Sequence, residues 1–469
     1  MSFNSLQFLL FFSVVVLWYF LLKPKHRWKL LLCASCLFYM AFKPFYILIL
    51  FFTIGIDYVA GIYIERSAGS KRKLLLVLSI ISNLGVLAVF KYYSFIETNF
   101  ALLVTFLHQA PPLPVLNIIL PIGLSFHTFQ AMSYTIEVYR GNQPAEKRLG
   151  IYALYVMFFP QLVAGPIERP QNLIHQFYEV KGWDFERIKA GLTRMAFGFL
   201  KKVVIADRLA VLVSDSYTHI EQHNGLSILL STIAFTFQIY FDFSAYTDIA
   251  LGAAQVLGFK LMENFRRPYS ATSIAEFWNR WHISLSSWFR DYVYIPLGGN
   301  RGSTWRWGFN IMLVFALSGL WHGASWKYVV WGGLHGTYMI VAMIKNQLFA
   351  RAGLKTRENF ITQTINQAIT FALVAFAWIF FRAGNFNEAL IAIDKIFHLA
   401  AGNVLHFSFN LIEIVFTCTM VLLVLLKEKH FDTLPTSNTK WFATIFGSLV
   451  ALCYLFGYFN ANQFIYFQF

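Results

Sequence analysis

The stretch FNIMLVFALSGLWHG, residues 309–323, joins an uncharged apolar run to a histidine that lies between a tryptophan and a glycine. The run from Phe309 to Trp321 is expected to lie in a membrane, with His322 at or below the membrane surface. A polar side chain at that depth is energetically costly and usually functional. Histidine can also take up and release a proton near neutral pH. The stretch therefore predicts a membrane helix that ends in a candidate proton-transfer residue.

The composition of the whole chain is typical of a polytopic membrane protein. Only 13% of the 469 residues are charged and 57% are hydrophobic, whereas a soluble domain carries about 25% charged residues. Recurring apolar runs predict an all-α fold with about 11 transmembrane helices, plus re-entrant or interfacial helices. No internal repeat or soluble linker interrupts them. We therefore expect one integral membrane domain, residues 1–469, with a motif-bearing core at about 115–382.

The net charge of +15 could indicate a nucleic-acid partner, but the positions of the basic residues favour membrane topology. They form short clusters between apolar runs, at residues 23–29, 66–73 and 427–429. Loops of this kind face the cytosol by the positive-inside rule. The pattern predicts that both termini lie on the outer, periplasmic side, and no nucleic-acid partner is expected.

The four cysteines do not indicate a metal site. Cys33 and Cys36 have the spacing of a redox or half-zinc motif, but no second pair follows and the setting is an apolar helix. Packing within an apolar helix explains these two cysteines better than a redox or zinc site does. We expect no bound metal and no permanently bound cofactor.

A polar segment between residues 274 and 292 is the second candidate for function. As one helix, at 100° per residue, it would place Asn279, His282, Ser286 and Arg290 in a sector about 80° wide. The alternative is a surface helix that its tryptophans anchor at the cytosolic interface. The segment alone does not decide between these interpretations.

His322 has neighbours that suit either a catalytic or a structural role. Gly319 and Gly323 allow close approach of another helix or of a ligand. Ser318 and Trp326, four residues before and after, share its face if the helix continues. A neutral buried imidazole is the form that a general base needs. The alternative is a histidine that is hydrogen-bonded across helices.

Other polar residues interrupt apolar runs that also contain proline or glycine, which predicts broken helices covered by protein or water. These residues are His127, Gln130, Gln161, Glu168, Arg169, Asp242 and Asp248. His335 is expected to be structural, in a glycine-rich helix contact. Residues 109–112 and 141–144 are predicted turns. No phosphate loop, GxSxG elbow or HExxH motif is present, so a Ser-His-Asp hydrolase is not supported.

Together these segments resemble membrane-bound O-acyltransferases of the bacterial alginate O-acetylation type. The resemblance runs almost end to end, over 120–130, 160–169, 240–248, 277–301, 318–326, 376–383 and the closing 463–469. Its most specific parts are RWHISLSSWFRDY at 280–292 and WHG at 321–323.

The resemblance implies an acyl-transfer centre in which His322 is the catalytic histidine and His282 the second polar member. It also implies a funnel or tunnel that joins a cytosolic donor to an external acceptor. Asn279 or His282 is a candidate donor to the developing oxyanion. The full set of candidate substrate-binding residues is Asn279, Ser286, Arg290, Ser318, Trp321 and Trp326.

The function expected on this basis is acetyl transfer in the bacterial inner membrane. The donor would be an acetyl thioester, on coenzyme A or an acyl carrier, and the acceptor an exopolysaccharide such as alginate. Membrane lipid and a periplasmic acetyltransferase would be its partners. One alternative acceptor is peptidoglycan or another envelope glycan. A different class, a polysaccharide or proton-coupled transporter, would predict inverted repeats, and none is found.

Overall fold

The computed structural model describes residues 1–107, 114, 116, 118–353, 359–398, 410–431, 434–436, 438–459 and 464–465. Of these residues 78% are helical and none lies in a strand, which confirms the all-α prediction. Five helical segments are long and apolar enough to cross a membrane, within the same described residues: Pro44–Arg66, Gly69–Phe106, Gly225–Leu257, Phe360–Arg382 and Thr439–Phe456. The predicted number of crossings, about 11, stays a prediction. The turn predicted at 109–112 lies outside the described residues, as do 463 and 466–469 of the closing segment.

The helices fall into two compact units, neither of which is continuous in sequence. Unit 1 contains Met1–Gly198, Tyr246–Met262 and Pro435–Phe446, and unit 2 contains the remaining residues. The long helix α11, Gly225–Leu257, contributes to both units. The units are therefore not successive domains, and one integral domain stays a prediction.

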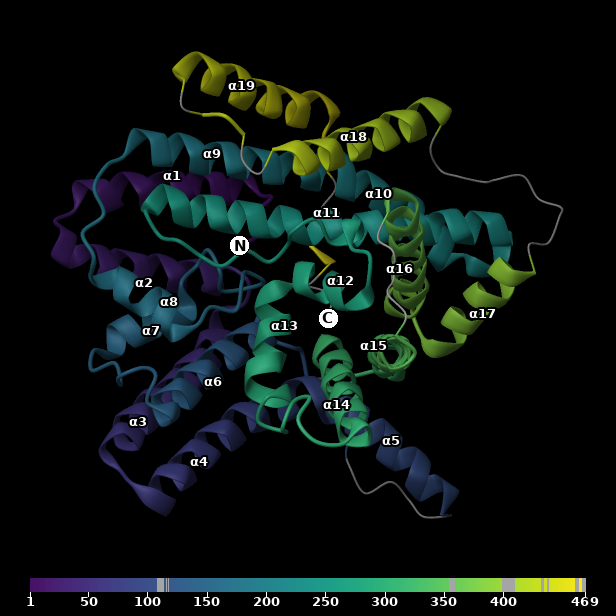
Figure 1. Cartoon of the computed structure of the whole chain (residues 1–469). Helices are drawn as coiled ribbons and strands as arrows, with labels where there is room; N and C mark the ends of the chain where they lie inside the picture. The colour runs from purple at the N-terminus through teal and green to yellow at the C-terminus, as the bar shows by residue number, and fades with distance from the viewer. Residues whose placement is uncertain are drawn as a thin grey trace. The chain divides into compact units, whose positions relative to one another are not determined.

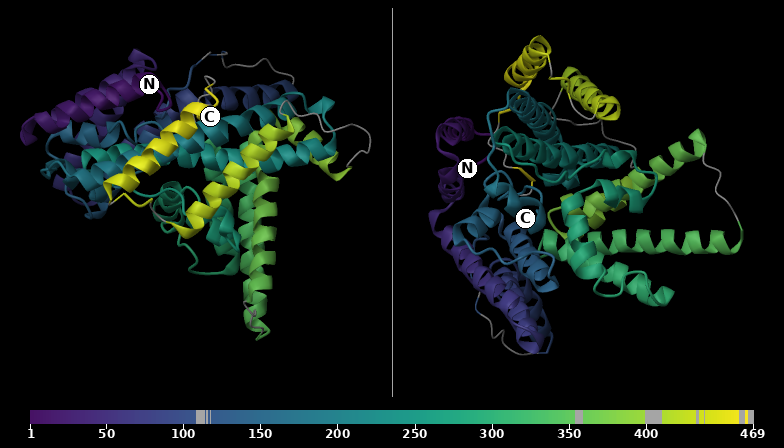
Figure 2. Two further views of the ribbon diagram at one scale, coloured as in Figure 1. Left: turned by 90° about the horizontal axis from the view of Figure 1, so that it is seen from above. Right: turned by 60° about the vertical axis from the view of Figure 1, so that its left-hand side comes forward.

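Unit 1 holds the N-terminal helices. They are α1 (Leu6–Leu21), α2 (Pro24–Met40), α3 (Ile47–Arg66), α4 (Gly69–Leu87), α5 (Tyr93–Phe106), α6 (Leu124–Arg140), α7 (Leu149–Met157), α8 (Pro170–Leu173) and all but the last residue of α9 (Phe185–Phe199). The helices α3, α4 and α6 lie side by side (Figures 1 and 2). Between them the Asp57 carboxylate is fully buried and accepts hydrogen bonds from Ser79 Oγ at 2.6 Å and Asn83 Nδ2 at 2.9 Å. A buried charge in an apolar bundle needs such partners.

Proline and glycine break the apolar runs of unit 1, as the sequence predicted. Gly123 has φ +77° where α6 begins, a conformation that favours glycine. After α7 ends, residues 158–168 are buried but form no regular helix. The Glu168 carboxylate there accepts the Met262 backbone N–H. Protein atoms thus satisfy the backbone that the broken helices expose.

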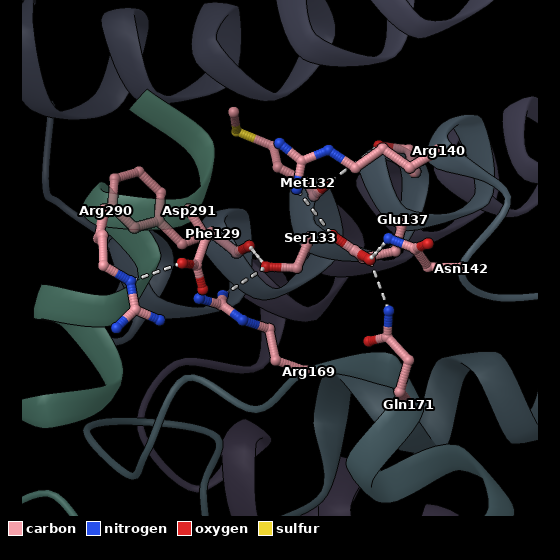
Figure 3. Close-up of polar contacts among 11 residues, drawn as sticks. Phe129, Met132, Ser133, Glu137, Arg140, Asn142, Arg169, Gln171, Arg290 and Asp291 are labelled. Carbon is pink, nitrogen blue, oxygen red and sulfur yellow. Dashed lines mark hydrogen bonds and ion pairs between the residues drawn. The ribbon is translucent and has the colours of Figure 1, made fainter. Parts of the chain in front are cut away.

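Glu137 fixes the chain that follows α6 (Figure 3). Its carboxylate accepts hydrogen bonds from Asn142 Nδ2 at 2.9 Å and Gln171 Nε2 at 2.6 Å, and pairs with Arg140 Nη1 at 3.1 Å. Gly141 ends the helix with φ +78°. Residues 141–144 are therefore a turn, as predicted.

Unit 2 contains the helices around the second half of the motif-bearing core. They are α10 (Asp207–Thr218), α12 (Ile274–Arg280), α13 (Ile283–Phe289), α14 (Thr304–His322), α15 (Trp326–Arg351), α16 (Phe360–Arg382), α17 (Phe386–Phe397) and α18 (Leu411–His430), with part of α19 (Thr439–Phe456). Two π-helical segments, η4 (Leu200–Ala206) and η7 (Arg290–Tyr294), interrupt the regular helices.

The helices α14 and α15 form an antiparallel hairpin in unit 2. A Cβ on Gly332 would overlap the Phe315 carbonyl oxygen, and one on Gly319 would overlap the Tyr328 carbonyl oxygen. Contacts near the turn thus join the end of α14 to the start of α15, and later residues of α15 meet earlier residues of α14. Small residues let the two backbones approach closely.

Candidate active site

The turn of the α14–α15 hairpin positions His322. The helix α14 ends at this residue, and Gly323 follows in an extended conformation. A Cβ on Gly323 would overlap the Tyr328 ring, just as one on Gly319 would overlap the Tyr328 backbone. Of the two uses predicted for these glycines, the structure shows close approach of a helix.

Aromatic rings surround the His322 imidazole, which is only 3% exposed. Its centroid lies 5.0 Å from the Trp321 ring, 4.9 Å from the Trp331 ring and 5.3 Å from the Phe381 ring, each approximately edge to face. Edge-to-face contacts of this length are favourable and directional. Side chains from α14, α15 and α16 therefore fix the orientation of the imidazole.

The single helix predicted for residues 274–292 is wrong. The structure has α12 and α13 with a break at His282, whose φ of +43° is left-handed and rare for a side chain larger than glycine. Asn264 diverts the backbone hydrogen bonds at the break. Its carbonyl accepts the Ile283 N–H at 3.0 Å, and its side-chain Oδ1 accepts the Ser284 N–H at 3.2 Å. Strained backbone of this kind persists where surrounding contacts hold it, often at functional sites.

The break directs His282 into the same aromatic surroundings as His322. Its ring is 1% exposed and meets the Phe243 ring edge-on, with centroids 4.7 Å apart. The two imidazole centroids are 6.5 Å apart, too far for a direct hydrogen bond between the rings. Burial lowers the pKa of His282 from its ordinary value of 6.5 to about 3. This imidazole is therefore neutral at physiological pH.

Two of the predicted substrate-binding residues lie beside the histidine pair. Trp321 is 4% exposed, and its ring lies within 5.0 Å of the His322 ring and 6.0 Å of the His282 ring. Ser318 is buried one turn before His322 on the same helix. Trp326 does not share their face, because α14 ends at His322 and Trp326 begins α15 with 57% of its surface exposed.

The other three predicted residues do not form a common polar face with His282, because the helix is broken there. Asn279 is exposed on α12. Ser286 is half-buried and donates its Oγ–H to the Trp281 carbonyl oxygen at 3.2 Å. The exposed Arg290 donates Nε–H to Asp291 at 2.8 Å, as Figure 3 shows. Of the four residues that were predicted to share one helix face, only His282 is fully buried.

Sequence reasoning missed the rings that contact the two imidazoles, Phe243, Trp331 and Phe381. It also missed Asn264, which holds the helix break, and Trp378, which packs on two of these rings. Trp331 stacks on Trp378 with centroids 5.7 Å apart, and Trp378 meets Phe381 edge-on at 5.1 Å. Phe243 and Phe381 belong to the segments 240–248 and 376–383 that carry the family resemblance. Membership of those segments is the one signal that could have found them, since aromatic residues are frequent throughout the chain.

This arrangement can support proton transfer to and from a bound group. Two imidazoles and the Trp321 ring lie together, and the other rings that contact the imidazoles, Phe243, Trp331 and Phe381, are aromatic. A surrounding with little water strengthens electrostatic interactions and limits competing hydrolysis. No group of three or more His, Cys, Asp or Glu side chains in the described part of the chain is arranged to hold a metal ion.

Residues 116–383 match the membrane-bound O-acyltransferase family, and this segment contains both His282 and His322. The match covers more than half of the 469 residues. The chain therefore belongs to the membrane-bound O-acyltransferase family and is an acyltransferase, as its sequence motifs predicted.

Named relatives agree with this class. The chain is 39% identical to the probable alginate O-acetylase AlgI of Pseudomonas aeruginosa over 401 residues, 85% of this chain and 75% of the relative. It is 33% identical to the peptidoglycan O-acetyltransferase of Helicobacter pylori over 441 residues, 87% of this chain and 81% of the relative. It is also 30% identical to the teichoic acid D-alanyltransferase of Bacillus subtilis over 300 residues, 60% of this chain and 73% of the relative.

Proposed function

We propose that this chain is an inner-membrane O-acetyltransferase that moves acetyl groups from a cytosolic thioester towards an exopolysaccharide such as alginate, with His322 as the general base. The observation that carries the proposal is the buried position of His322 at the hairpin turn, next to Trp321 and His282. Similarity to alginate O-acetylases over 85% of the chain supports the choice of acceptor class.

The reaction has a simple balance of atoms. An acceptor hydroxyl oxygen attacks the carbonyl carbon of the acetyl thioester while neutral His322 takes the hydroxyl proton. The tetrahedral intermediate carries a negative oxygen, and its collapse breaks the carbon–sulfur bond. The protonated His322 then gives its proton to the leaving thiolate. The products are an acetyl ester and a thiol, and His322 is neutral again.

His282 is the better of the two candidates for stabilising the oxyanion. It is buried beside Trp321, whereas Asn279 is exposed on α12. A neutral imidazole can donate one ring N–H, and donors aimed at the developing charge are a large part of acyl-transfer catalysis. Ser318 and Trp321 line the same region and are proposed to contact the acetyl donor.

A second acceptor class is also supported by an observation. The peptidoglycan O-acetyltransferase of Helicobacter pylori aligns with 87% of the chain, although at 33% identity. The proton transfers at His322 would be the same with either glycan, because both present hydroxyl groups. We also propose a periplasmic acetyltransferase as a partner that completes the transfer to the glycan, and we propose that both termini lie on the periplasmic side.

The test replaces His322 with Ala in the native host and confirms normal membrane levels. O-acetylation of the extracellular polysaccharide and its export are then measured side by side. We expect acetylation to fall about 100- to 10,000-fold, the usual contribution of a general acid–base group, while export continues. Retained acetylation would overturn the assignment of His322. Lost export with normal acetylation would favour a transporter, and normal polysaccharide with reduced peptidoglycan acetylation would favour the second acceptor.

A further inference from the structure

Residues from two segments that carry the family resemblance meet in unit 2 but have no part in the proposed chemistry. Segment 240–248 contributes Asp242, and the closing segment contributes Phe464 and Ile465. The Ile465 backbone N–H donates to Asp242 Oδ2 at 2.7 Å. The other carboxylate oxygen, Oδ1, lies 2.7 Å from Lys202 Nζ. The two oxygens of Asp242 therefore bind two different parts of the chain.

The charges of this cluster are almost completely buried. Lys202, Asp207 and Asp242 are 1%, 2% and 2% exposed. Lys202 Nζ pairs with Asp207 Oδ1 at 2.9 Å and lies 4.4 Å from the centroid of the Phe464 ring. Removing Lys202 would leave two buried carboxylates without their counter-charge. Replacing Asp242 with Asn leaves Lys202 paired with Asp207, but it removes one of the two oxygens that accept from Lys202 and from the Ile465 N–H. Lys202 also lies in the π-helical segment η4, and π-helical turns are frequent near functional sites.

Asp242 directly precedes, in the sequence, the residue whose side chain packs against His282. The next residue on α11 is Phe243, whose ring meets the His282 ring at 90° with centroids 4.7 Å apart. The second support of His282 is Asn264, which accepts hydrogen bonds from the backbone at the helix break. A shift of α11 would therefore move one of the two supports of His282.

We propose that Asp242 is a positioning residue for the histidine pair, and that residues 456–459 and 464–465, near the end of the sequence, are part of this support. Asp242 ties α11 to η4 and to the closing segment, and so keeps Phe243 against His282. This inference rests on the proposed function of His322 and His282. Asp242 itself touches no reacting group.

Residues Phe456 and Tyr458, which precede the closing segment, are also attached to η4 and α10. The Tyr458 N–H donates to the Val203 carbonyl oxygen at 2.8 Å. Arg208 Nη2 donates to the Phe456 carbonyl oxygen at 2.9 Å. Loss of the single hydrogen bond from Ile465 should therefore leave the segment docked, which makes a selective variant possible.

The first experiment compares Asp242→Asn with Asp248→Asn. Asp248 is a matched control, because it lies on the same helix and in the same motif, but it belongs to unit 1, where its carboxylate pairs with Arg194 Nε at 3.0 Å. Acetyl transfer from radiolabelled acetyl-CoA is measured in permeabilised cells of the native host, per molecule of folded protein. We expect Asp242→Asn to lower kcat by about 10- to 100-fold through misplaced catalytic groups, with KM for acetyl-CoA unchanged and the pH profile of kcat shifted. Asp248→Asn and Asp242→Glu should remain closer to the wild type.

The second experiment keeps Asp242 and changes its backbone partner. Ile465→Pro removes the N–H that Asp242 accepts, whereas Ile465→Ala keeps it. We expect a lower kcat and a shifted pH profile for Ile465→Pro only. If both Asp242→Asn and Ile465→Pro only reduce the amount of folded protein, with kcat, KM and pH profile unchanged per molecule, Asp242 is structural and the inference is overturned. An active His322→Ala variant in the same assay would instead overturn the proposed function.

Discussion

His322 and His335 lie on successive helices of one hairpin, and both imidazoles contact the Trp331 ring. The ring centroids are 4.9 Å apart for His322 and 5.0 Å apart for His335. His322 lies at the turn, 6.5 Å from His282. His335 lies further along α15, stacked on Phe277 and fully buried. Neither ring nitrogen of His335 has a hydrogen-bond partner within the described residues. A buried imidazole without partners is costly compared with an apolar ring of similar shape.

This contrast leads to a prediction for His335→Phe. We expect the variant to keep normal acetyl transfer and to have an equal or higher melting temperature in detergent, because phenylalanine fills the aromatic surroundings without burying polar nitrogens. His322→Phe, with a comparable change of shape, should lose acetyl transfer. Loss of transfer in His335→Phe at normal membrane levels would contradict the structural role of His335.

His282 gives a prediction for pH dependence. Burial lowers its pKa in the folded protein to about 3, whereas an unfolded histidine has its ordinary pKa of 6.5. Below pH 6.5 the unfolded chain binds a proton that the folded chain does not, so stability falls as the pH falls towards 3, by about 1.4 kcal/mol per pH unit. Above pH 7 His282 has no effect of this kind. Melting of the detergent-solubilised protein between pH 7 and pH 5 should show a shallower decrease for His282→Gln than for the wild type. If the melting temperatures of the two proteins depended equally on pH, the loss of stability at low pH would not arise from His282.

At the scale of elements, the α14–α15 hairpin depends on the close approach of two backbones. A Cβ on Gly332 would overlap the Phe315 carbonyl oxygen, whereas nothing lies within 4 Å of a Cβ on Gly333. We expect Gly332→Ala to destabilise the protein by about 1–3 kcal/mol through overpacking. Gly333→Ala should be neutral or stabilising by up to about 1 kcal/mol, because alanine favours the helix.

The stabilities of the Gly332→Ala and Gly333→Ala variants can be compared by thermal melting and by the amount of protein in the membrane. Since the hairpin holds His322, Gly332→Ala should also reduce acetyl transfer, while Gly333→Ala should not. Similar stability of the two variants would show that the hairpin does not depend on this contact.

The sequence predicted single elements better than their junctions. The uncharged run that ends at Trp321 became α14, because periodic apolar residues and a flanking glycine are local signals. The helix predicted through His282 failed, because the break depends on Asn264, a residue distant in sequence whose backbone and side chain compete for the helix hydrogen bonds. Phe243 and Phe381 come from separate helices, and only tertiary packing brings them to the imidazoles.

At the scale of the whole molecule, composition was sufficient to predict a helical membrane protein but not the number of crossings. The 20 residues of α3 span about 30 Å, which matches the hydrocarbon thickness of a bilayer. The hairpin helices are less clear cases, because α15 contains Lys327, His335 and Lys345 within its 26 residues. Polar residues within a helix weaken the hydropathy signal on which a count of crossings depends.

The basic clusters make a prediction for topology. The loop between α3 and α4 is expected in the cytosol and the loop between α2 and α3 in the periplasm. Ala68 is exposed between α3 and α4, and Phe45 is exposed in the short 3₁₀ turn Pro44–Tyr46, at the start of the candidate span that contains α3. In a variant without native cysteines, a membrane-impermeant maleimide should label Phe45→Cys in intact spheroplasts, and Ala68→Cys only after permeabilisation. The reverse pattern would invert the predicted orientation of this part of the chain.

The most direct test of the central claim is the rate of acetyl transfer by His322→Gln. Permeabilised cells of the native host receive radiolabelled acetyl-CoA, and label in the polysaccharide is measured at equal membrane levels of wild type, His322→Gln and His335→Phe. We predict at least a 100-fold loss for His322→Gln, because glutamine keeps a polar side chain but cannot accept and return the proton, and about normal transfer for His335→Phe. Near-normal transfer by His322→Gln would contradict the proposal that this histidine is the general base.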